Sequence, residues 1–174
     1  MIFVFAGNEA RKELGIAAWK RGGAPVLVLS VGRFEWRRYE RLGLPGDAAL
    51  REAVARVPPR QRHFFVVVEG ASAEVVPVPL RPFGTRNEAR ALAVLVRERR
   101  WRTVTVISSG FHLRRAVLVV ERALRGTGAA ASYAALPPGA DRYAQGRWWR
   151  TPRGIRVVAS EVVKLAVYRA WLKP

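Results

Sequence analysis

Two short apolar runs on either side of one helical segment constrain the fold of this chain more than any other feature. Residues 2–5 are continuously apolar, as in strands buried on both faces of a parallel sheet. A helical pattern over residues 9–21 stops at a glycine pair, and residues 26–29 form the second apolar run. A strand, a helix and a strand within about thirty residues predict a βαβ unit, which requires a right-handed crossover and parallel strands.

Further patterns extend this unit along the whole chain. They predict strands over residues 64–68, 104–107 and 133–136, and helices over residues 47–57, 111–125 and 152–172. Residues 75–80 are extended, but Pro77 and Pro79 remove ladder hydrogen bonds, so we expect an edge strand or a loop there. The sequence therefore predicts one domain over residues 1–174, a Rossmann-like three-layer α/β/α fold around a mostly parallel sheet of about five strands.

Residues 33–41 allow three interpretations. They are basic and aromatic, and they predict either a solvated helical turn, with Phe34 and Trp36 directed inward, or an exposed lid over a site. Basic residues interleaved with aromatic ones also suit a nucleic-acid surface. We therefore keep all three interpretations open.

The C-terminal segment predicts a loop followed by a long helix. The loop covers residues 141–150, and Thr151 and Pro152 are typical of an N-cap and a first helical position. The helix is amphipathic, and its predicted inward side consists of Ile155, Val158, Val162, Leu165 and Ala166. We expect this helix to pack on the sheet, with an acidic bilayer as the alternative partner.

The helix before residues 104–107 begins with a polar motif. Thr85 and Glu88 form T-x-x-E ahead of an apolar run, the signature of a capping box. The same residues follow a predicted strand, where they suit a ligand site equally well. Capping and ligand binding are both consistent with this spacing.

The strand over residues 104–107 ends in Ser108 and Ser109, at the start of the next helix. A helix N-terminus offers backbone N–H groups and a positive field, which attract anions. Arg114 and Arg115 follow in the first turn. This end of the strand therefore predicts an anion-binding site, although the serines also suit ordinary N-caps and the arginines a solvated face.

His112 is the main candidate for acid–base chemistry. It lies in the first turn of the helix, where the helix dipole lowers the pKa of an imidazole and favours its neutral form. A neutral imidazole can act as a general base or donate to a phosphate oxygen. The other histidine, His63, precedes a predicted strand, where a structural role suffices.

These motifs resemble the core of the YdcF-like proteins, the SanA/ElyC group. In that family a T-x-x-E-A element opens a helix and a V-T-S-x-[YF]-H-x-x-R-A element closes the next strand. The chain has TRNEA from Thr85 and ISSGFHLRRA from Ile107. The family's first two strands end in a glycine-rich turn and in Ser-Gly-Gly, and here Gly7, Ser30 and Gly32 stand in those places.

Ligands of open parallel sheets bind beyond the carboxyl ends of the strands, where we also expect Glu69. Our catalytic candidates are His112 and Glu88. Our ligand-binding candidates are Gly7, Asn8, Arg11, Ser30, Gly32, Thr85, Arg86, Asn87, Ser108, Ser109 and Arg115. We expect no metal site, because the chain has no cysteine and only two histidines.

Charge points to an anionic partner. The net charge is +18, from 31 Lys and Arg against 13 Asp and Glu. Such an excess suits a phosphorylated ligand, an acidic membrane surface or, as a weaker candidate, nucleic acid. No basic leader and no membrane-length apolar run is present, so we expect a cytoplasmic protein without a transmembrane segment that contacts membranes at most peripherally.

The resemblance implies a bacterial cell-envelope protein that binds, and hydrolyses or transfers, a phosphate-bearing small molecule. A lipid-linked sugar phosphate and a nucleotide-type ligand are the two classes it implies, and S-adenosylmethionine is a cofactor associated with the family. The alternative is a non-catalytic basic module for acidic membrane or nucleic acid. The two hypotheses differ in salt dependence, since binding by surface charge weakens steeply as salt rises.

Overall fold

The computed structural model describes residues 1–79, 83–140 and 148–171. Its strands are β1 (Ile2–Val4), β2 (Val26–Val31), β3 (Phe64–Glu69), β4 (Ser72–Pro77), β5 (Thr103–Ser108) and β6 (Ala130–Ala135). Its α-helices are α1 (Glu9–Lys20), α2 (Asp47–Ala55), α3 (Gly84–Glu98), α4 (Gly110–Leu124) and α5 (Pro152–Trp171). Three 3-10 helices are η1 (Glu35–Leu42), η2 (Pro59–Gln61) and η3 (Trp148–Arg150).

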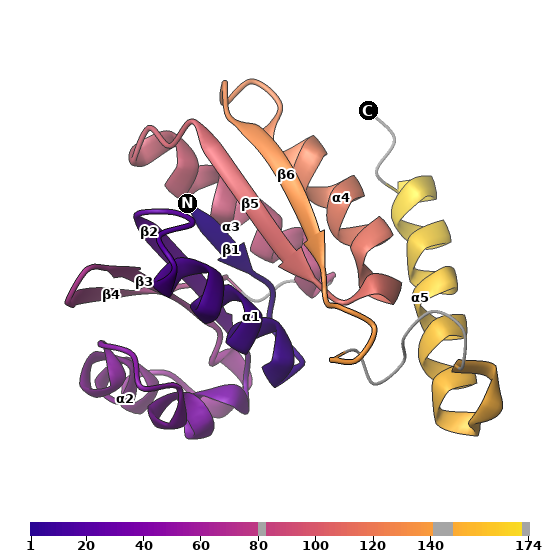
Figure 1. The fold of residues 1–174 in the computed structure, drawn as a ribbon, viewed down its shortest axis with the longest axis horizontal. Coiled ribbons are helices and arrows are strands. Elements are labelled where there is room, and N and C mark those ends of the chain that lie inside the picture. The colour runs from indigo at the N-terminus through magenta and orange to yellow at the C-terminus, as the bar shows by residue number, and fades with distance from the viewer. Residues whose placement is uncertain (80–82, 141–147, 172–174) are drawn as a thin grey trace.

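The strands form one six-stranded sheet in the order β4-β3-β2-β1-β5-β6 (Figure 1). Strands β2, β1, β5 and β6 are parallel, whereas β3 is antiparallel to β2 and β4 is antiparallel to β3. The predicted α/β fold with a mostly parallel sheet is therefore confirmed, with one strand more than the five expected. The extra strand is β4, which lies at the edge of the sheet, as expected from Pro77.

Each face of the sheet has its own core, because successive side chains of a strand point to opposite faces. Phe3 and Phe5 pack with the apolar sides of α3 and α4. Ile2 and Val4 pack on the other face with residues of α1, η1 and α2. Helices therefore cover both faces and produce the three predicted layers, compatible with a Rossmann-like fold.

Helix α1 packs very close to the centre of the sheet because Gly15 has no side chain. A Cβ atom at Gly15 would lie 2.4 Å from the Cγ2 atom of Val4 in β1. The first turn of α1 begins at Glu9, shortly after β1 ends at Val4. The residues of that turn consequently belong to the carboxyl edge of the sheet.

Strands β3 and β4 form a hairpin in which Glu69 pairs with Ser72 around a turn that begins with Gly70. Since β3 runs against β2, its first residue Phe64 pairs with Val31, the last residue of β2. His63 therefore lies at the carboxyl edge of the parallel strands. Glu69 pairs with the first residue of β2 and lies at the opposite edge, so our expectation for Glu69 was wrong.

The direction of the connections reverses between β1 and β5. The chain passes from β1 through α1 to β2 on one side, and from β5 through α4 to β6 on the other side. Helices α1 and α4 consequently lie against opposite faces of the sheet. Open α/β sheets bind ligands at such a topological switch point, outside the carboxyl ends of the two strands.

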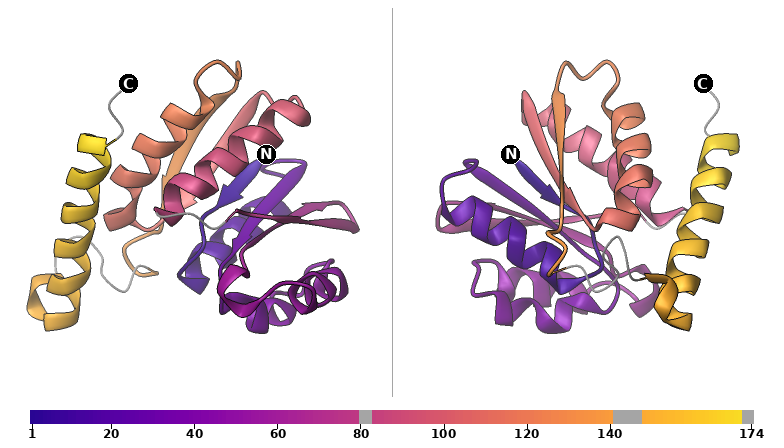
Figure 2. Two further views of the ribbon diagram at one scale, coloured as in Figure 1. Left: turned by 180° about the vertical axis from the view of Figure 1, so that it is seen from behind. Right: turned by 45° about the vertical axis from the view of Figure 1, so that its right-hand side comes forward.

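Helix α5 is outermost and packs against α4 instead of the sheet (Figure 2). Its buried positions are Gly154, Glu161 and Tyr168. Of the five residues predicted to face inward, Val158 and Leu165 are half-buried, whereas Ile155, Val162 and Ala166 are exposed. The predicted N-cap is confirmed, because the hydroxyl of Thr151 accepts the N–H of Gly154 at 3.1 Å.

Three predicted segments reach outside the described residues: residue 80 of the extended stretch, residues 141–147 of the loop and residue 172 of the last helix.

Candidate functional site

Arg11 bridges the switch point. Its Nε atom donates to the hydroxyl of Ser109, at the start of α4, over 2.8 Å. Its Nη1 atom donates to the carbonyl of Ala6, just after β1, over 3.0 Å. The residue is only 5% exposed. A buried guanidinium therefore connects the ends of β1 and β5, where the sheet topology predicts a ligand.

Gly7 makes room for this arginine. Its φ of +128° lies in a region that side chains other than glycine rarely adopt. A Cβ atom at Gly7 would lie 3.2 Å from the Nη1 atom of Arg11. The glycine is required both for the turn after β1 and for the position of the guanidinium beneath it.

Glu88 organises the first of two buried polar clusters. Its Oε1 atom accepts the hydroxyl of Ser30 at 2.6 Å and the N–H of Ala6 at 3.0 Å. Ser30 also contacts the Nε2 atom of His63 at 2.8 Å. Because a hydroxyl has one hydrogen, which Ser30 donates to Glu88, the Nε2 atom of His63 must be the donor in that second contact. We call these residues the carboxylate cluster.

His112 organises the second cluster. Its Nδ1 atom lies 2.6 Å from the hydroxyl of Ser108, and its Nε2 atom lies 3.5 Å from the hydroxyl of Thr85. The ring packs edge-on against Phe5, with 5.4 Å between the ring centroids. Arg115 donates to the same Thr85 hydroxyl. We call Ser108, His112, Thr85 and Arg115 the guanidinium cluster.

Burial and positive neighbours keep His112 neutral. Burial lowers the pKa of His112 well below its ordinary value, and the charges of Arg11, Arg115 and Lys164 lower it further. The neutral imidazole predicted from the sequence is therefore supported, by a cause that the sequence did not reveal. Three cations raise the electrostatic potential at this ring, which disfavours the imidazolium.

Arg115 is held in place by α5. Its Nε and Nη2 atoms donate to the two carboxylate oxygens of Glu161 at 2.8 and 2.9 Å, a bidentate pair. Lys164 adds a contact of 3.0 Å to the same carboxylate. Burial alone would raise the pKa of Glu161, but the hydrogen bonds and charges of Arg115 and Lys164 lower it overall. A pocket of about 200 Å³ adjoins this pair between the first turn of α4, η3 and α5.

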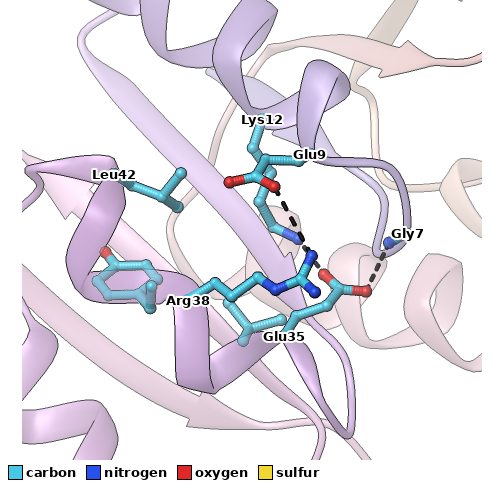
Figure 3. Close-up of a pocket in the computed structure, with 8 residues that line it drawn as sticks. Gly7, Glu9, Lys12, Glu35, Arg38 and Leu42 are labelled. Atoms are coloured by element: carbon cyan, nitrogen blue, oxygen red, sulfur yellow. Dashed lines mark hydrogen bonds and ion pairs between the residues drawn. The ribbon is translucent and has the colours of Figure 1, made fainter.

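A second pocket lies on the other side of Gly7, under η1 (Figure 3). It holds about 60 Å³ and includes Gly7, Lys12 and Glu35 in its lining. The carboxylate of Glu35 accepts the N–H of Gly7 at 2.7 Å and pairs with Lys12 (Figure 3). In this structure a carboxylate of the chain itself therefore occupies the position that a small anion would take beside these two donors.

The segment over residues 33–41 consequently borders the site. It forms most of the 3-10 helix η1, in which Tyr39 is buried. Phe34 is 63% exposed, so the inward direction expected for it was wrong, whereas Trp36 is half-buried. Through Glu35 the segment covers the turn after β1.

The capping interpretation of Thr85 and Glu88 was wrong. Helix α3 begins at Gly84, with Phe83 in the N-cap position and no side-chain cap. Glu88 instead contacts Ser30 and the backbone of Ala6, and Thr85 accepts from Arg115. Glu88 thus joins α3 to the sheet edge, and Thr85 joins α3 to α4. Their spacing places them on the side of α3 that faces the site.

The remaining predicted residues lie farther from these clusters. Asn8 is exposed and caps α1 by accepting the N–H of Ala10 at 3.2 Å. Asn87 lines an apolar pocket between β4 and α3. Gly32 packs against Glu35, and Arg86 is half-buried in the first turn of α3. The structure therefore brings Arg11, Ser30, Thr85, Glu88, Ser108, Ser109, His112 and Arg115 into the two clusters and their bridge.

Sequence reasoning missed four residues of this region. Lys12 and Glu35 form the ion pair beside Gly7, His63 joins the carboxylate cluster, and Glu161 binds Arg115. The sequence did hold a signal for His63. A glycine in a short turn between two β-rich runs is typical of a hairpin, and the two strands of a hairpin run in opposite directions, which would have placed the start of the 64–68 strand at the carboxyl edge.

Within the described residues, no group of three or more His, Cys, Asp and Glu side chains is arranged to hold a metal ion.

Comparison of the chain with protein-family models, with curated proteins and with solved structures finds no match. The resemblance to the YdcF-like proteins therefore stays a prediction.

Over residues 1–79, 83–140 and 148–171, no helix combines the length and the apolar character needed to cross a membrane.

Proposed function

We propose that this chain binds a phosphate-bearing small molecule at the switch point between β1 and β5. One observation carries the proposal: two buried arginines from helices on opposite faces of the sheet meet at the start of α4, where Arg11 donates to Ser109 and Arg115 donates to Thr85; their charges also lower the pKa of His112. Both arginines are more than nine-tenths buried, at 5% and 7% exposure. A positive potential in a buried crevice attracts an anion more strongly than the same charges on an open surface.

The two clusters suit the two ends of one ligand. The phosphate would lie toward Arg11, Ser109 and Arg115, whose donors are suited to its oxygens. Glu88 and Ser30 would accept hydroxyl or amine hydrogens from the rest of the molecule. Sugar phosphates and nucleotide-type ligands combine these groups, and the lipid-linked sugar phosphate suggested by the family resemblance is one of them.

His112 is the group we assign to proton transfer. In hydrolysis, a neutral imidazole takes a proton from the attacking water while the bond between phosphorus and the leaving oxygen breaks. It then returns the proton to the leaving oxygen. Glu88 would orient the ligand. Because two hydrogen-bonding neighbours fix the ring of His112, its direction is set before a ligand arrives.

A calorimetric binding screen tests the proposal. The ligands are sugar phosphates, nucleotides and S-adenosylmethionine, each at moderate and at high salt. The variants are Arg11→Gln, His112→Ala and the control Arg125→Gln, which removes an exposed charge at the far end of α4. We expect one phosphorylated ligand to bind at both salt concentrations and to lose at least about tenfold in affinity in Arg11→Gln, with Arg125→Gln unchanged.

The opposite pattern would reject the pocket. If no small molecule binds, or if Arg125→Gln weakens binding as much as Arg11→Gln, the charge acts as a general surface field. Loss of turnover with retained binding in His112→Ala would separate the catalytic role from the binding role. The test works with whichever phosphorylated ligand the screen identifies.

A non-catalytic basic module is the second candidate, and the arginine–aromatic pairs in and beside η1 favour it. The guanidinium of Arg33 lies 4.9 Å from the ring centroid of Phe34, an exposed side chain. Arg37 and Arg62 each lie 5.6 Å from the ring of Trp36. Such pairs can stack on the bases of nucleic acid, whose binding would weaken steeply with salt. Under either proposal we place the chain in the cytoplasm, and under the first it acts in cell-envelope metabolism.

A further inference from the structure

Exposed apolar side chains are concentrated at the C-terminal end of the described chain. Trp149, Ile155, Val162 and Val163 are 52%, 46%, 62% and 62% exposed. Elsewhere in the described residues, the large hydrophobic side chains with such exposure are Phe34 before η1, Phe83 before α3 and Val94 within α3, which are well separated in the sequence. A cluster of this kind on one surface element marks an interaction site, whereas single exposed side chains do not.

Helical geometry gathers these side chains on one side of α5. Glu161 and Tyr168, seven residues apart, face α4 and are buried. Ile155, Val162 and Val163 lie toward the other side of the helix, and the small residues Ala159, Ala166 and Ala170 continue this surface. We call Ile155, Ala159, Val162, Val163, Ala166 and Ala170 the outer face of α5. It is apolar although its side chains are exposed, and at Val162 it borders the pocket between α4, η3 and α5.

Basic side chains border this outer face. Arg153, Arg156, Lys164 and Arg169 are all exposed, whereas the acidic residue of α5, Glu161, is buried against Arg115. Every exposed charge on the described part of α5 is therefore positive. An apolar stripe with basic borders matches a surface that combines hydrocarbon with negative charge.

Three occupants can be compared. A second copy would bring two molecules of net charge +18 together with their basic borders adjacent, which electrostatic repulsion opposes. Nucleic acid would use the charges but leave Val162 and Val163 in water. An acidic lipid bilayer accepts both features, since the apolar face enters the boundary between headgroups and acyl chains while the arginines contact the lipid phosphates.

We infer that α5 is a peripheral membrane-binding helix that lies flat on an acidic lipid surface. Trp149 precedes the helix and adds an aromatic ring of the type that is enriched at the interface between membrane and water. This inference does not depend on the proposed binding site, because no residue of the outer face belongs to the two clusters; Val162 alone also borders the pocket beside Arg115, whereas Ile155 and Val163 do not. Docking by α5 would keep the molecule beside a bilayer through its C-terminal helix.

Vesicle co-sedimentation at moderate salt tests this inference. Vesicles of phosphatidylglycerol mixed with phosphatidylcholine are compared with vesicles of phosphatidylcholine alone. We expect the native chain to sediment with the acidic vesicles. The double variant Val162→Ser/Val163→Ser should lower the partition coefficient at least about tenfold, because two valine side chains no longer contribute the free energy of their transfer from water to the lipid. The control Val94→Ser makes the same change at an exposed position of α3 and should bind as the native chain does.

Two further variants make the result decisive. Ile155→Ser tests the same face at a separate position and should weaken binding in the same direction. His112→Gln tests whether the vesicles are held through the pocket, and we expect it to leave sedimentation unchanged.

The inference is overturned if the native chain does not sediment with acidic vesicles. It is equally overturned if the double variant and Ile155→Ser bind as tightly as the native chain. Sedimentation lost only in His112→Gln would assign the lipid to the pocket instead of α5. The pocket proposal itself is judged separately, from the small-molecule screen with Arg11→Gln.

Discussion

The two clusters at the carboxyl edge contain the same pair of residue types in opposite electrostatic surroundings. In the carboxylate cluster Ser30 contacts His63, and Glu88 is their charged neighbour. In the guanidinium cluster Ser108 contacts His112, and Arg115 approaches from the side of Thr85. A buried Ser–His pair therefore has no fixed chemistry, because the adjacent charge determines which protonation states are favoured.

This difference makes the carboxyl edge of the sheet electrostatically asymmetric. The strands order the two clusters across the sheet, with the negative group near β2 and β3 and the positive groups near β5 and α4. A ligand with a phosphate at one end and hydroxyl groups at the other end would bind in a single orientation. The comparison can be tested on the folded protein without any ligand.

The largest effect is expected from Arg115→Met. It removes the guanidinium and leaves Glu161 largely buried with Lys164 as a half-exposed partner, so we expect the free energy of unfolding to fall by about 3 kcal/mol. Urea denaturation monitored by circular dichroism measures this change. Arg114→Met, at an exposed neighbouring position, should change stability by less than about 0.5 kcal/mol. Equal effects of the two substitutions would contradict the role assigned to the buried pair.

Ser30→Ala should have the next largest effect. The substitution removes a hydrogen bond to a carboxylate and leaves the Nε2 donor of His63 without its acceptor, which should cost about 2 kcal/mol. The same denaturation measurement applies. Ser72→Ala is the control, because the Ser72 hydroxyl makes an exposed bond of 2.8 Å to the Glu69 carbonyl and its loss should be nearly neutral.

The pH dependence of stability tests the neutral state of His112. Since its pKa in the folded state is lowered, the unfolded chain binds a proton more readily, and stability falls as pH drops through the ordinary value of 6.5. Between pH 7.5 and 5.5 this single group should cost about 1.4 kcal/mol. His112→Gln should reduce the slope over that interval. An unchanged slope in the variant would show that His112 accepts a proton in the folded state.

The smallest effect is expected from Ser108→Ala. The hydroxyl of Ser108 contacts a neutral imidazole, so its removal should cost about 1 kcal/mol, half the value for Ser30→Ala. The ratio of the losses in unfolding free energy caused by Ser30→Ala and Ser108→Ala is the most direct measure of the electrostatic difference between the two clusters. If Ser108→Ala costs as much as Ser30→Ala, the two clusters are equivalent in stability, and the comparison fails.

The layered fold could be predicted because it depends on local patterns. The apolar runs that became β1 and β2 are uninterrupted over residues 2–5 and 26–29, β5 is a short β-rich run, and the helical periods between them are clear. The direction of β3 was not predicted, since a short apolar run reads the same whether it is parallel or antiparallel. That single direction decides that His63, and not Glu69, lies beside the carboxyl ends of β1 and β2.

Side-chain roles were harder to predict than positions. The spacing of Thr85 and Glu88 fits both a capping box and a site-facing helix surface, and only the position of α3 beside β1 and β2 separates the two. The inward side of α5 was misjudged for a similar reason. Apolar residues occur all around α5, so their pattern does not mark the buried side. That side is fixed by the ion pair between Glu161 and Arg115, two residues that are 46 positions apart in the sequence. Long-range ion pairs leave no periodic signal.

The central position of β1 has a consequence for biosynthesis. One edge of β1 pairs with β2, but its other edge pairs with β5, which begins about a hundred residues later at Thr103. During translation β1 is therefore made early and keeps one open edge for several seconds, at about 5–20 residues per second. Ribosome-associated chains would expose that edge until β5 emerges. Final assembly of the buried arginine bridge must follow that moment, since Ser109 comes directly after β5.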